Sequence, residues 1–374
     1  MITLAAVGDV NPRREDPDSL FEYAGPVLRQ ADIAFGQLET VFSTRGVPQL
    51  AMLGGMRGDP KNAPSVARAG FSVMSVAGNH TMDWGEEAFF DTLNTMRNLN
   101  VETVGVGKDI EEARRPAILE RDGTKVAFLG YCSVLPKGYD AREGKCGLAP
   151  MRATTSYQQV DWQAGTPPLV LTKAEPEDLE ALVDDVNKAK AQADVVVVSI
   201  HWGIHYIPGA LAMYEFEVGH AAIDAGANLI LGHHSHNIKG IEVYKGMVIF
   251  HSIGNFAVDS FIKRHNRWRS IYHFEPDPEY PTYSFPPDCR KTMIVKCLIG
   301  NKIEKVSYLP FEVNKKGQPE PLSPEDPRSE EHFKYVEWVC RDQDWIQSSR
   351  AKAMRLSSLP SRPSYCDYCE VTQC

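Results

Sequence analysis

The stretch Leu231-Gly232-His233-His234-Ser235-His236 carries three histidines within four positions. It follows residues 228–230, a short apolar run that predicts a buried strand. Imidazole is a costly filler for an apolar interior, so core packing does not explain three rings at a strand end. The His-x-His pair, His234 and His236, can direct two imidazoles from one loop at a metal ion. A polar surface loop is the alternative that this stretch alone leaves open.

Length, composition and charge bound the class of protein. The 374 residues allow one large α/β domain, or a domain with a smaller appendage. With 43% hydrophobic and 24% charged residues, the composition is that of a soluble globular protein. The net charge of -9 disfavours a surface that follows nucleic-acid phosphates, so we expect no nucleic-acid partner. No apolar run approaches the roughly 18–20 residues that span a bilayer, which predicts no membrane segment.

The start of the chain and its cysteines bear on the compartment. Residues 1–9 have no basic leader and run straight into an apolar strand, which predicts no signal peptide and a cytoplasmic location. Most of the eight cysteines are then expected as reduced thiols. Cys366 and Cys369 form a CxxC pair, but a zinc site there lacks a second pair of ligands nearby.

Apolar runs and helical periodicity alternate along the chain, which predicts an α/β fold. The predicted strands and helices are separated by short polar or glycine-containing segments. We expect strands at residues 2–7, 33–35, 71–76, 101–106, 126–131, 194–200, 228–230 and 248–251, and helices at residues 19–30, 86–99 and 176–192.

Polar side chains with metal-ligand chemistry stand directly after most of these strands. In open α/β sheets, ligands bind in the crevice beyond the carboxyl ends of the strands. Strand ends often carry Gly or Asp, so one or two such coincidences would mean little. A larger set that contains two carboxylates, amides and several imidazoles predicts one shared site. The set comprises Asp9, Glu39, Asn79, His80, His201, the histidines of 233–236, Ser252 and Asn255.

The chemistry of this set fits a pair of divalent ions. Carboxylates and imidazoles hold Mn, Fe or Zn, and an Asn carbonyl is an acceptable neutral ligand. Two such ions can clamp a bridging water and lower its pKa. A pair of ions needs a carboxylate between them, and Glu39 is the candidate. His80 follows Asn79 directly, so its ring can face the substrate and act as general acid.

Six motifs together resemble the CapA/PgsA family of bacterial capsule and poly-γ-glutamate synthesis proteins, relatives of the calcineurin-like metallophosphoesterases. They are GDVN (8–11), QLET (37–40), AGNHTMDWG (77–85), SIHWGIHY (199–206), GHHSH (232–236) and HSIGNF (251–256). The resemblance covers about residues 1–260. It implies a four-layer α/β/β/α sandwich of metallophosphoesterase type, with a dimetal-type pocket at the strand ends.

The resemblance also implies a role for each matching residue. Asp9 would ligate the first metal and Glu39 would bridge. Asn79 and His201 would serve the second metal, while His234 and His236 would divide between the two. His80 matches the proton-donating histidine, so His80, Asp9 and His201 are the candidate catalytic residues. His233 in place of His234 is an open alternative.

The motifs depart from the family pattern at four positions. Asn11 stands where metallophosphoesterases at large carry the histidine of Asp-x-His. CapA-type proteins usually lack that histidine too, but its absence leaves one metal a ligand short. Glu39 replaces the usual Asp, His205 stands where CapA-like chains often have Glu, and Ser235 replaces a frequent Pro. Each change is compatible with metal binding, but two ions, one ion and a metal-free pocket that moves protons all stay open.

Four residues are candidates for binding substrate. Arg13, followed by Arg14, can hold an anionic group, although a solvated surface pair is equally consistent with the sequence. Trp84 can wall the pocket, and so can Trp202, with packing against a helix expected for at least one of them. His205 and Asn255 complete the set because they stand in the site motifs. We expect a small-molecule or peptide-like anionic substrate.

Residues beyond the last motif predict a lid and an appendage. Residues 261–290 mix basic and aromatic residues with prolines and are interpreted as a lid loop over the site. A hairpin at residues 293–298 and 303–309 finishes the sheet, and residues 330–345 predict a helix capped by Ser329. The prediction is therefore a metallophosphoesterase-like domain at residues 1–310, with a helical and irregular extension at 311–374.

Three functions are consistent with these features. The first is a soluble metal-dependent hydrolase of a phosphoester or of an amide bond in a γ-glutamyl or peptide-like substrate. The second is metal-independent acid–base chemistry on the same fold, such as epimerisation of a peptide Cα. The third is a non-catalytic subunit of capsule-polymer synthesis, which the missing membrane anchor disfavours. A homodimer is compatible with each.

Overall fold

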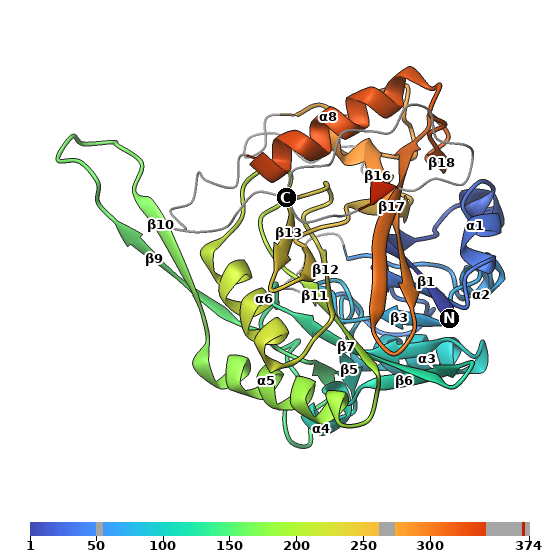
Figure 1. Ribbon diagram of the computed structural model, residues 1–374, viewed down its shortest axis with the longest axis horizontal. Coiled ribbons are helices and arrows are strands. Elements are labelled where there is room, and N and C mark those ends of the chain that lie inside the picture. Colours follow the sequence, from blue (N-terminus) through green and yellow to red (C-terminus); the bar gives the residue numbers. More distant parts are fainter. Residues whose placement is uncertain (50–54, 262–273, 342–368, 371–374) are drawn as a thin grey trace.

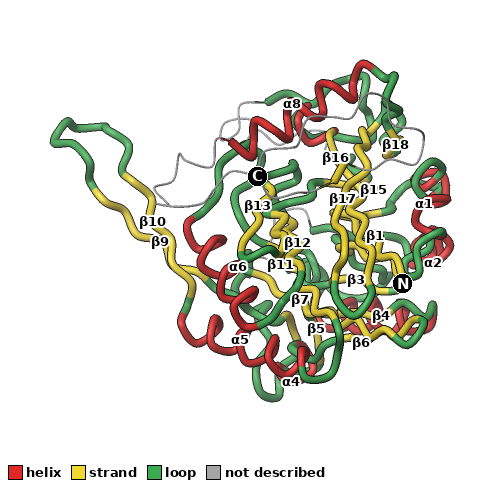
Figure 2. The backbone as a smooth tube through the Cα atoms, in the orientation of Figure 1, coloured by secondary structure: helices red, strands yellow, loops and turns green. Residues whose placement is uncertain are grey.

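The computed structural model describes residues 1–49, 55–261, 274–341 and 369–370 (Figure 1). Two β-sheets face one another, and helices cover the outer face of each sheet (Figure 2). The four-layer α/β/β/α sandwich predicted from the sequence is therefore confirmed. Among the described helices, none has the length and apolar character that a bilayer crossing requires.

The first sheet is built around β1 (Ile2–Asn11), which pairs in parallel with β2 (Ile33–Leu38) and β15 (Asn255–Val258) and antiparallel with β16 (Lys291–Ile299). Its strand order is β18-β17-β16-β1-β2-β3-β4. The remaining members are β3 (Val73–Ser75), β4 (Glu102–Val104), β17 (Ile303–Val313), β18 (Pro319–Pro321) and β19 (Cys369–Glu370), which pairs with β17.

The second sheet has the order β13-β14-β12-β11-β7-β6. Its central strand β11 (Val195–His201) is buried throughout, as its continuous β-branched run predicts. Parallel neighbours flank β11, and antiparallel strands form both edges of the sheet. These strands are β12 (Leu229–His233), β14 (Met247–Phe250), β7 (Thr124–Cys132), β13 (Ile241–Tyr244) and β6 (Ala117–Arg121).

Three apolar layers hold the sandwich together. Side chains from both sheets, such as Phe35 and Phe128, stack in the layer between the sheets. A second layer joins the first sheet to α1 (Gly25–Arg29), α2 (Pro64–Ala69) and α3 (Gly85–Asn98). A third joins the second sheet to α4 (Ile110–Ala113), α5 (Pro176–Lys190) and α6 (Met213–Ala225). Short 3₁₀ helices occur at Pro17–Phe21, Pro60–Asn62 and Pro287–Arg290.

The predicted helix at residues 19–30 was wrong, because the structure has two shorter helices there. Residues 19–30 divide into the 3₁₀ helix Pro17–Phe21 and the separate helix α1. Pro26 stands in the first turn of α1, where its missing N–H costs nothing. A helix running on from Phe21 would instead place this proline in its interior, where the ring clashes with the preceding turn.

The C-terminal part of the described chain packs on the sandwich. The predicted boundary at residue 310 falls within β17, which continues to Val313. Helix α8 (Pro327–Arg341) inserts Tyr335, Val336 and Val339 into the apolar layer between the sheets. The predicted helix at 330–345 thus begins earlier than expected, and its last four positions lie outside the described residues. Cys366 and most of the tail also lie outside them.

Two small two-stranded sheets, separate from the two large ones, were not expected from the sequence. β5 (Val106–Gly107) and β8 (Gly147–Leu148) form a small ladder beside the second sheet. β9 (Ala153–Gln158) and β10 (Leu169–Ala174) form a two-stranded hairpin, which extends away from the body of the molecule (Figure 1).

Candidate functional site

The strand ends named by the sequence meet at one edge of the sandwich. Asp9 lies near the end of β1, and Glu39 follows β2 directly. His201 and His233 are the last residues of β11 and β12, where they stand side by side in the parallel register. Asn255 opens β15 and pairs with Asp9. The two sheets therefore present their polar strand ends to each other.

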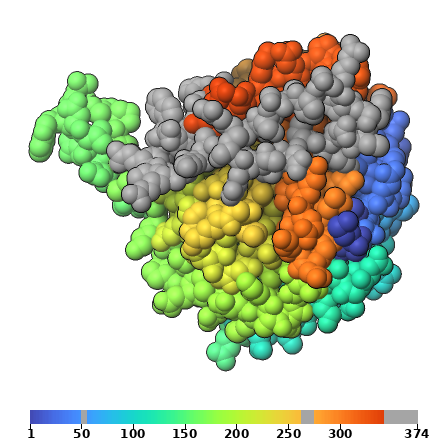
Figure 3. Space-filling model, viewed as in Figure 1, coloured from blue at the N-terminus to red at the C-terminus, as the bar shows by residue number. Residues whose placement is uncertain are grey.

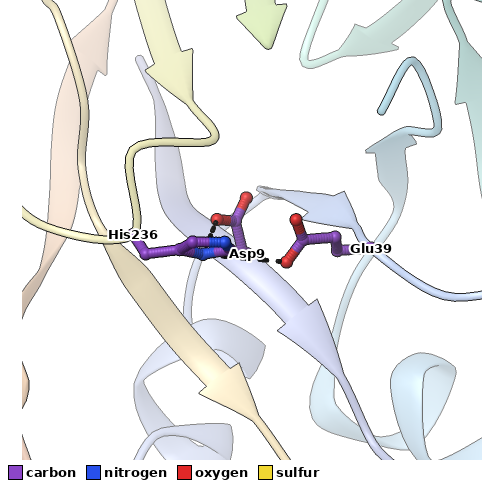
Figure 4. Close-up of side chains that lie close together, drawn as sticks. All are labelled: Asp9, Glu39 and His236. Carbon is purple, nitrogen blue, oxygen red and sulfur yellow. Dashed lines mark ion pairs between the residues drawn. The ribbon is translucent and has the colours of Figure 1, made fainter. Parts of the chain in front are cut away.

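Asp9, Glu39 and His236 form the tightest group at this edge (Figure 4). One ligand atom from each lies within 4.8 Å of the others. His236 Nδ1 lies 3.4 Å from Asp9 Oδ2 and 3.9 Å from Glu39 Oε2. Among the described residues this is the one group of three or more His, Cys, Asp or Glu side chains with that spacing.

The donor set of this group fits a divalent cation. Both carboxylates are buried, and their four oxygens accept no hydrogen bond from the described residues. Two carboxylates this close in a dry site repel each other and are costly to ionise. Their partner is the His236 ring: burial lowers its pKa, but the charges of Glu39 and Asp9 outweigh burial and raise it to about 9. Burial, followed by the charge of Asp9, raises the pKa of Glu39 to about 7. A bound cation would relieve both costs, and two oxygens with one imidazole nitrogen suit Mn, Fe or Zn.

A second group of predicted ligands stands beside the first. His201 Nε2 lies 2.8 Å from Asn79 Oδ1 and 3.1 Å from His234 Nδ1. The same Nε2 is 3.9 Å from Glu39 Oε1, so Glu39 faces both groups, as a bridging residue must. Burial lowers the pKa values of His201 and His234 well below normal. Both rings are therefore neutral at pH 7 and have a lone pair to offer.

Backbone strain aims the histidine loop. His234 has φ 88° and His236 has φ 62°, a left-handed conformation that is uncommon for residues other than glycine. Such residues cluster at functional sites, because the surrounding fold must hold them there. The conformation turns His234 toward His201, while His233 lies with Nδ1 3.9 Å from Asp9 Oδ1. Burial lowers the pKa of His233 to about 4, so it too is neutral.

His80 has a partner that the sequence reasoning missed. Its Nδ1 lies 2.6 Å from Asp83 Oδ2, and that oxygen also accepts a hydrogen bond from the backbone N of Met56 at 2.6 Å. The hydroxyl of Tyr139 donates to the other oxygen, Oδ1, at 3.1 Å. Burial lowers the pKa of His80, but the bond and charge of Asp83 outweigh it, and the net pKa is raised. Asp83 stands within the AGNHTMDWG motif, three residues after His80, which was the available signal.

The two predicted arginines differ in what they contact. Arg14 forms an ion pair with buried Asp259, with Nη2 2.8 Å from Oδ1, and is thereby committed to the fold. Arg13 donates from Nη1 to Met56 Sδ at 3.4 Å and has no ion pair among the described residues. Met56 also contacts Asp83, so the Arg13 guanidinium lies close to the surroundings of His80.

The two tryptophans also differ. Trp202 is fully buried, donates from Nε1 to the carbonyl of His251 at 2.9 Å and packs in the layer under α6. It therefore has the packing role expected for one of the pair. Trp84 is partly exposed at the start of α3, with the Arg57 guanidinium stacked 4.0 Å from its ring.

His205 and Asn255 both contact the histidine loop. The His205 ring lies 3.9 Å from the His234 ring and 5.1 Å from the His236 ring, centroid to centroid. Asn255 Oδ1 lies 2.8 Å from His236 Nδ1, while its Nδ2 donates to the Tyr283 hydroxyl at 2.9 Å. Asn255 therefore orients His236.

The predicted lid reaches the site through its described part. Residues 262–273 lie outside the described residues. Phe285, within the remainder, is buried and has its ring centroid 4.9 Å from that of His236.

Comparison with known proteins decides the family. Residues 3–260 match the family described as Bacterial capsule synthesis protein PGA_cap. The chain belongs to this family. The match contains all six site motifs, from Asp9 to Asn255.

Two relatives show how far the similarity extends. The chain is 27% identical over 307 residues to the PGA biosynthesis protein CapA of Bacillus subtilis, covering 79% of this chain and 74% of that one. It is 26% identical over 269 residues to the capsule biosynthesis protein CapA of Bacillus anthracis, covering 69% of this chain and 60% of that one. Among solved structures, the calcineurin-like phosphoesterase YfkN from Bacillus subtilis is similar at a TM-score of 0.40 and 14% identity, covering 90% of this chain and 98% of that one.

Proposed function

We propose that this PGA_cap protein is a metal-dependent hydrolase of a phosphoester or of an amide bond in a γ-glutamyl or peptide-like substrate. The observation that carries the proposal is the buried pair Asp9 and Glu39, whose oxygens have no hydrogen-bond partner in the described structure. With His236 they make a buried set of three cation ligands.

The proposed ligands divide between two positions that share Glu39. Asp9, Glu39 and His236 would hold one ion, and Glu39, Asn79, His201 and His234 would hold the second. Divalent ions bound to these residues would supply polarisation of the scissile group and a bound water of lowered pKa. The neutral state of His201 and His234 supports this role, because a protonated imidazole has no lone pair for a metal. His236, whose pKa the two carboxylates raise to about 9, would have to release a proton when an ion binds.

His80 is the proposed general acid. Asp83 holds the ring through Nδ1, which leaves Nε2 to carry the proton that a leaving group needs. The raised pKa of His80 keeps more of the ring protonated near neutral pH, as a proton donor requires. The Tyr139 hydroxyl and the Met56 N–H hold the Asp83 carboxylate in position.

Arg13 is proposed to bind an anionic group of the substrate. Its guanidinium has no carboxylate partner in the described structure, unlike that of Arg14, which Asp259 neutralises. A guanidinium binds phosphate or carboxylate oxygens in bidentate fashion. The names of the relatives, capsule and PGA biosynthesis proteins, favour a poly-γ-glutamate-type substrate over a simple phosphoester.

Activity assays with and without metal test the proposal. Purified protein is stripped with chelator, reloaded with Mn²⁺ or Zn²⁺ and assayed on p-nitrophenyl phosphate and on γ-glutamyl-p-nitroanilide. We expect hydrolysis of at least one substrate, restored only by metal and reduced by roughly 10²–10⁴-fold in His80→Ala. Turnover that is equal in the stripped and reloaded protein would instead favour metal-independent acid–base chemistry. No turnover of these substrates or of poly-γ-glutamate would favour a non-catalytic subunit.

A further inference from the structure

The hairpin of β9 and β10 has no role in the proposed site. It stands out from the body of the molecule as an arm, green in Figures 1 and 3, with its tip far from the sandwich. The two strands pair only with each other within the described structure, over six residues each. An isolated two-stranded hairpin is at best marginally stable in water, so an arm of this kind gains from a further strand.

The arm also carries exposed apolar side chains. Twelve large hydrophobic residues are exposed in the described structure, and four of them lie here. Trp162 at the tip is 94% exposed, and Tyr157 on β9 is 71% exposed. Val160 and Val170 are the other two. Tyr157 and Val170 stand opposite each other in the register of the hairpin, and neighbouring exposed apolar groups of this kind mark interaction sites.

The outer edge of β10 is protected against further strand pairing, whereas the outer edge of β9 is unprotected. Natural proteins guard open strand edges with charged residues or prolines. β10 is preceded by Pro167 and Pro168, carries Lys173, and packs at its base on α6, where Ala174 N donates to Glu217 Oε2 at 2.9 Å. β9 has the sequence ATTSYQ, with no charge and no proline. An edge left open in this way indicates that another strand covers it.

Charge favours a second copy of this chain as the covering strand. Between Ala153 and Thr172 the arm has one charged residue, Asp161, although the whole chain carries a net charge of -9. Two arms can therefore approach without the repulsion that two bodies would feel. The arm has no basic residue in this span that would recruit an acidic partner or an anionic membrane.

We propose that β9 pairs antiparallel with β9 of a second copy and joins two arms into a four-stranded sheet. Like strands that pair antiparallel are related by a two-fold axis, which gives a closed, self-complementary dimer. A residue at the centre of β9, Thr155 or Ser156, then lies next to its own counterpart. Six residues of edge pairing make a small interface, so the dimer forms reversibly, at micromolar concentrations or above.

Sedimentation velocity of the full chain over a range of about 1–200 μM tests the dimer. We expect the mass to rise with concentration from 41.7 kDa toward twice that value. Ser156→Lys places two like charges beside the axis and should weaken the dimer at least about tenfold. Ser156 is exposed, so this variant leaves the fold intact. The control Gln192→Lys adds the same charge to an exposed position after α5 and should leave association unchanged.

Each other result overturns the proposal. A wild-type mass of 41.7 kDa at every concentration removes the dimer. A dimer that Ser156→Lys leaves intact, or that both variants weaken equally, places the interface elsewhere. A monomer that co-sediments with phosphatidylcholine vesicles, and loses this in Trp162→Ser, makes the arm a membrane anchor instead.

Discussion

Replacing Gly8 with alanine should disrupt the site through the backbone alone. A Cβ at this position would lie 1.8 Å from the carbonyl oxygen of Gly254 and 2.9 Å from its carbonyl carbon. No flexible side chain can give way there, because both atoms belong to the backbone. The same carbonyl accepts the N–H of Asp9 at 3.2 Å, so separating the strands also moves a proposed ligand.

The cost follows from the extent of the clash. Overpacking a well-filled interior costs about 1–3 kcal/mol, and a clash with backbone belongs at or above the upper end. We therefore expect Gly8→Ala to lose about 3 kcal/mol of unfolding free energy in a urea titration followed by tryptophan fluorescence. Its affinity for Mn²⁺, measured by calorimetry, should fall as well.

Gly300→Ala is the matched control for this experiment. Its Cβ would meet Glu304 Oε1 at 3.5 Å, an ordinary contact with a flexible side chain. The control should stay within about 1 kcal/mol of wild type. Equal stability and equal Mn²⁺ affinity in Gly8→Ala and Gly300→Ala would refute the close approach of β1 to the 252–255 segment.

Three further predictions concern the ion pair, the buried histidine of α8 and the proposed acid. Asp259→Ala leaves Arg14 without its buried partner and should lower the free energy of unfolding by about 3–5 kcal/mol in the same urea titration. A loss below about 1 kcal/mol would mean that solvent screens the ion pair. Burial lowers the pKa of His332 to about 4, so the free energy of unfolding should fall as pH falls from about 6.5 toward 4, by about 3 kcal/mol at most. Urea titrations of His332→Gln should show a smaller loss over the same pH range. Asp83→Asn removes the charge that raises the pKa of His80, so the decline in kcat as pH rises should move to lower pH, and an unmoved profile would contradict the assignment.

The strand-end residues of the site could be predicted because the carboxyl ends of parallel strands lie at the same edge of a sheet. Asp9, Glu39 and His201 each stand at or directly after an apolar run, so the sheet geometry alone brings them to the same edge. The sequence does not determine which ring nitrogen faces which oxygen, because that depends on loop conformation. The left-handed backbone of His234 and His236 is one such feature that no spacing rule predicts.

The missed residues act across long stretches of sequence. Tyr139 and Met56 reach Asp83 from loops on either side of it, and neither loop has a periodic pattern. The arm was missed because Thr and Ser fill the middle of β9 (ATTSYQ), which gives no clear alternation of apolar and polar residues. Its exposed position, and an edge that pairs with no other described strand, emerge only from the fold.

The stoichiometry of bound metal tests the central claim most directly. Chelator-treated protein is titrated with Mn²⁺ or Zn²⁺ in a calorimeter, and bound metal is then counted by mass spectrometry with inductively coupled plasma. Wild type should bind two ions per chain, and Asp9→Asn and His236→Ala should each lose at least about tenfold in affinity for the metal. The control Asp122→Asn changes an exposed turn residue and should match wild type. A wild-type protein that binds neither ion, or Asp9→Asn and His236→Ala variants that bind both ions as tightly as wild type, would contradict a metal centre at Asp9, Glu39 and His236.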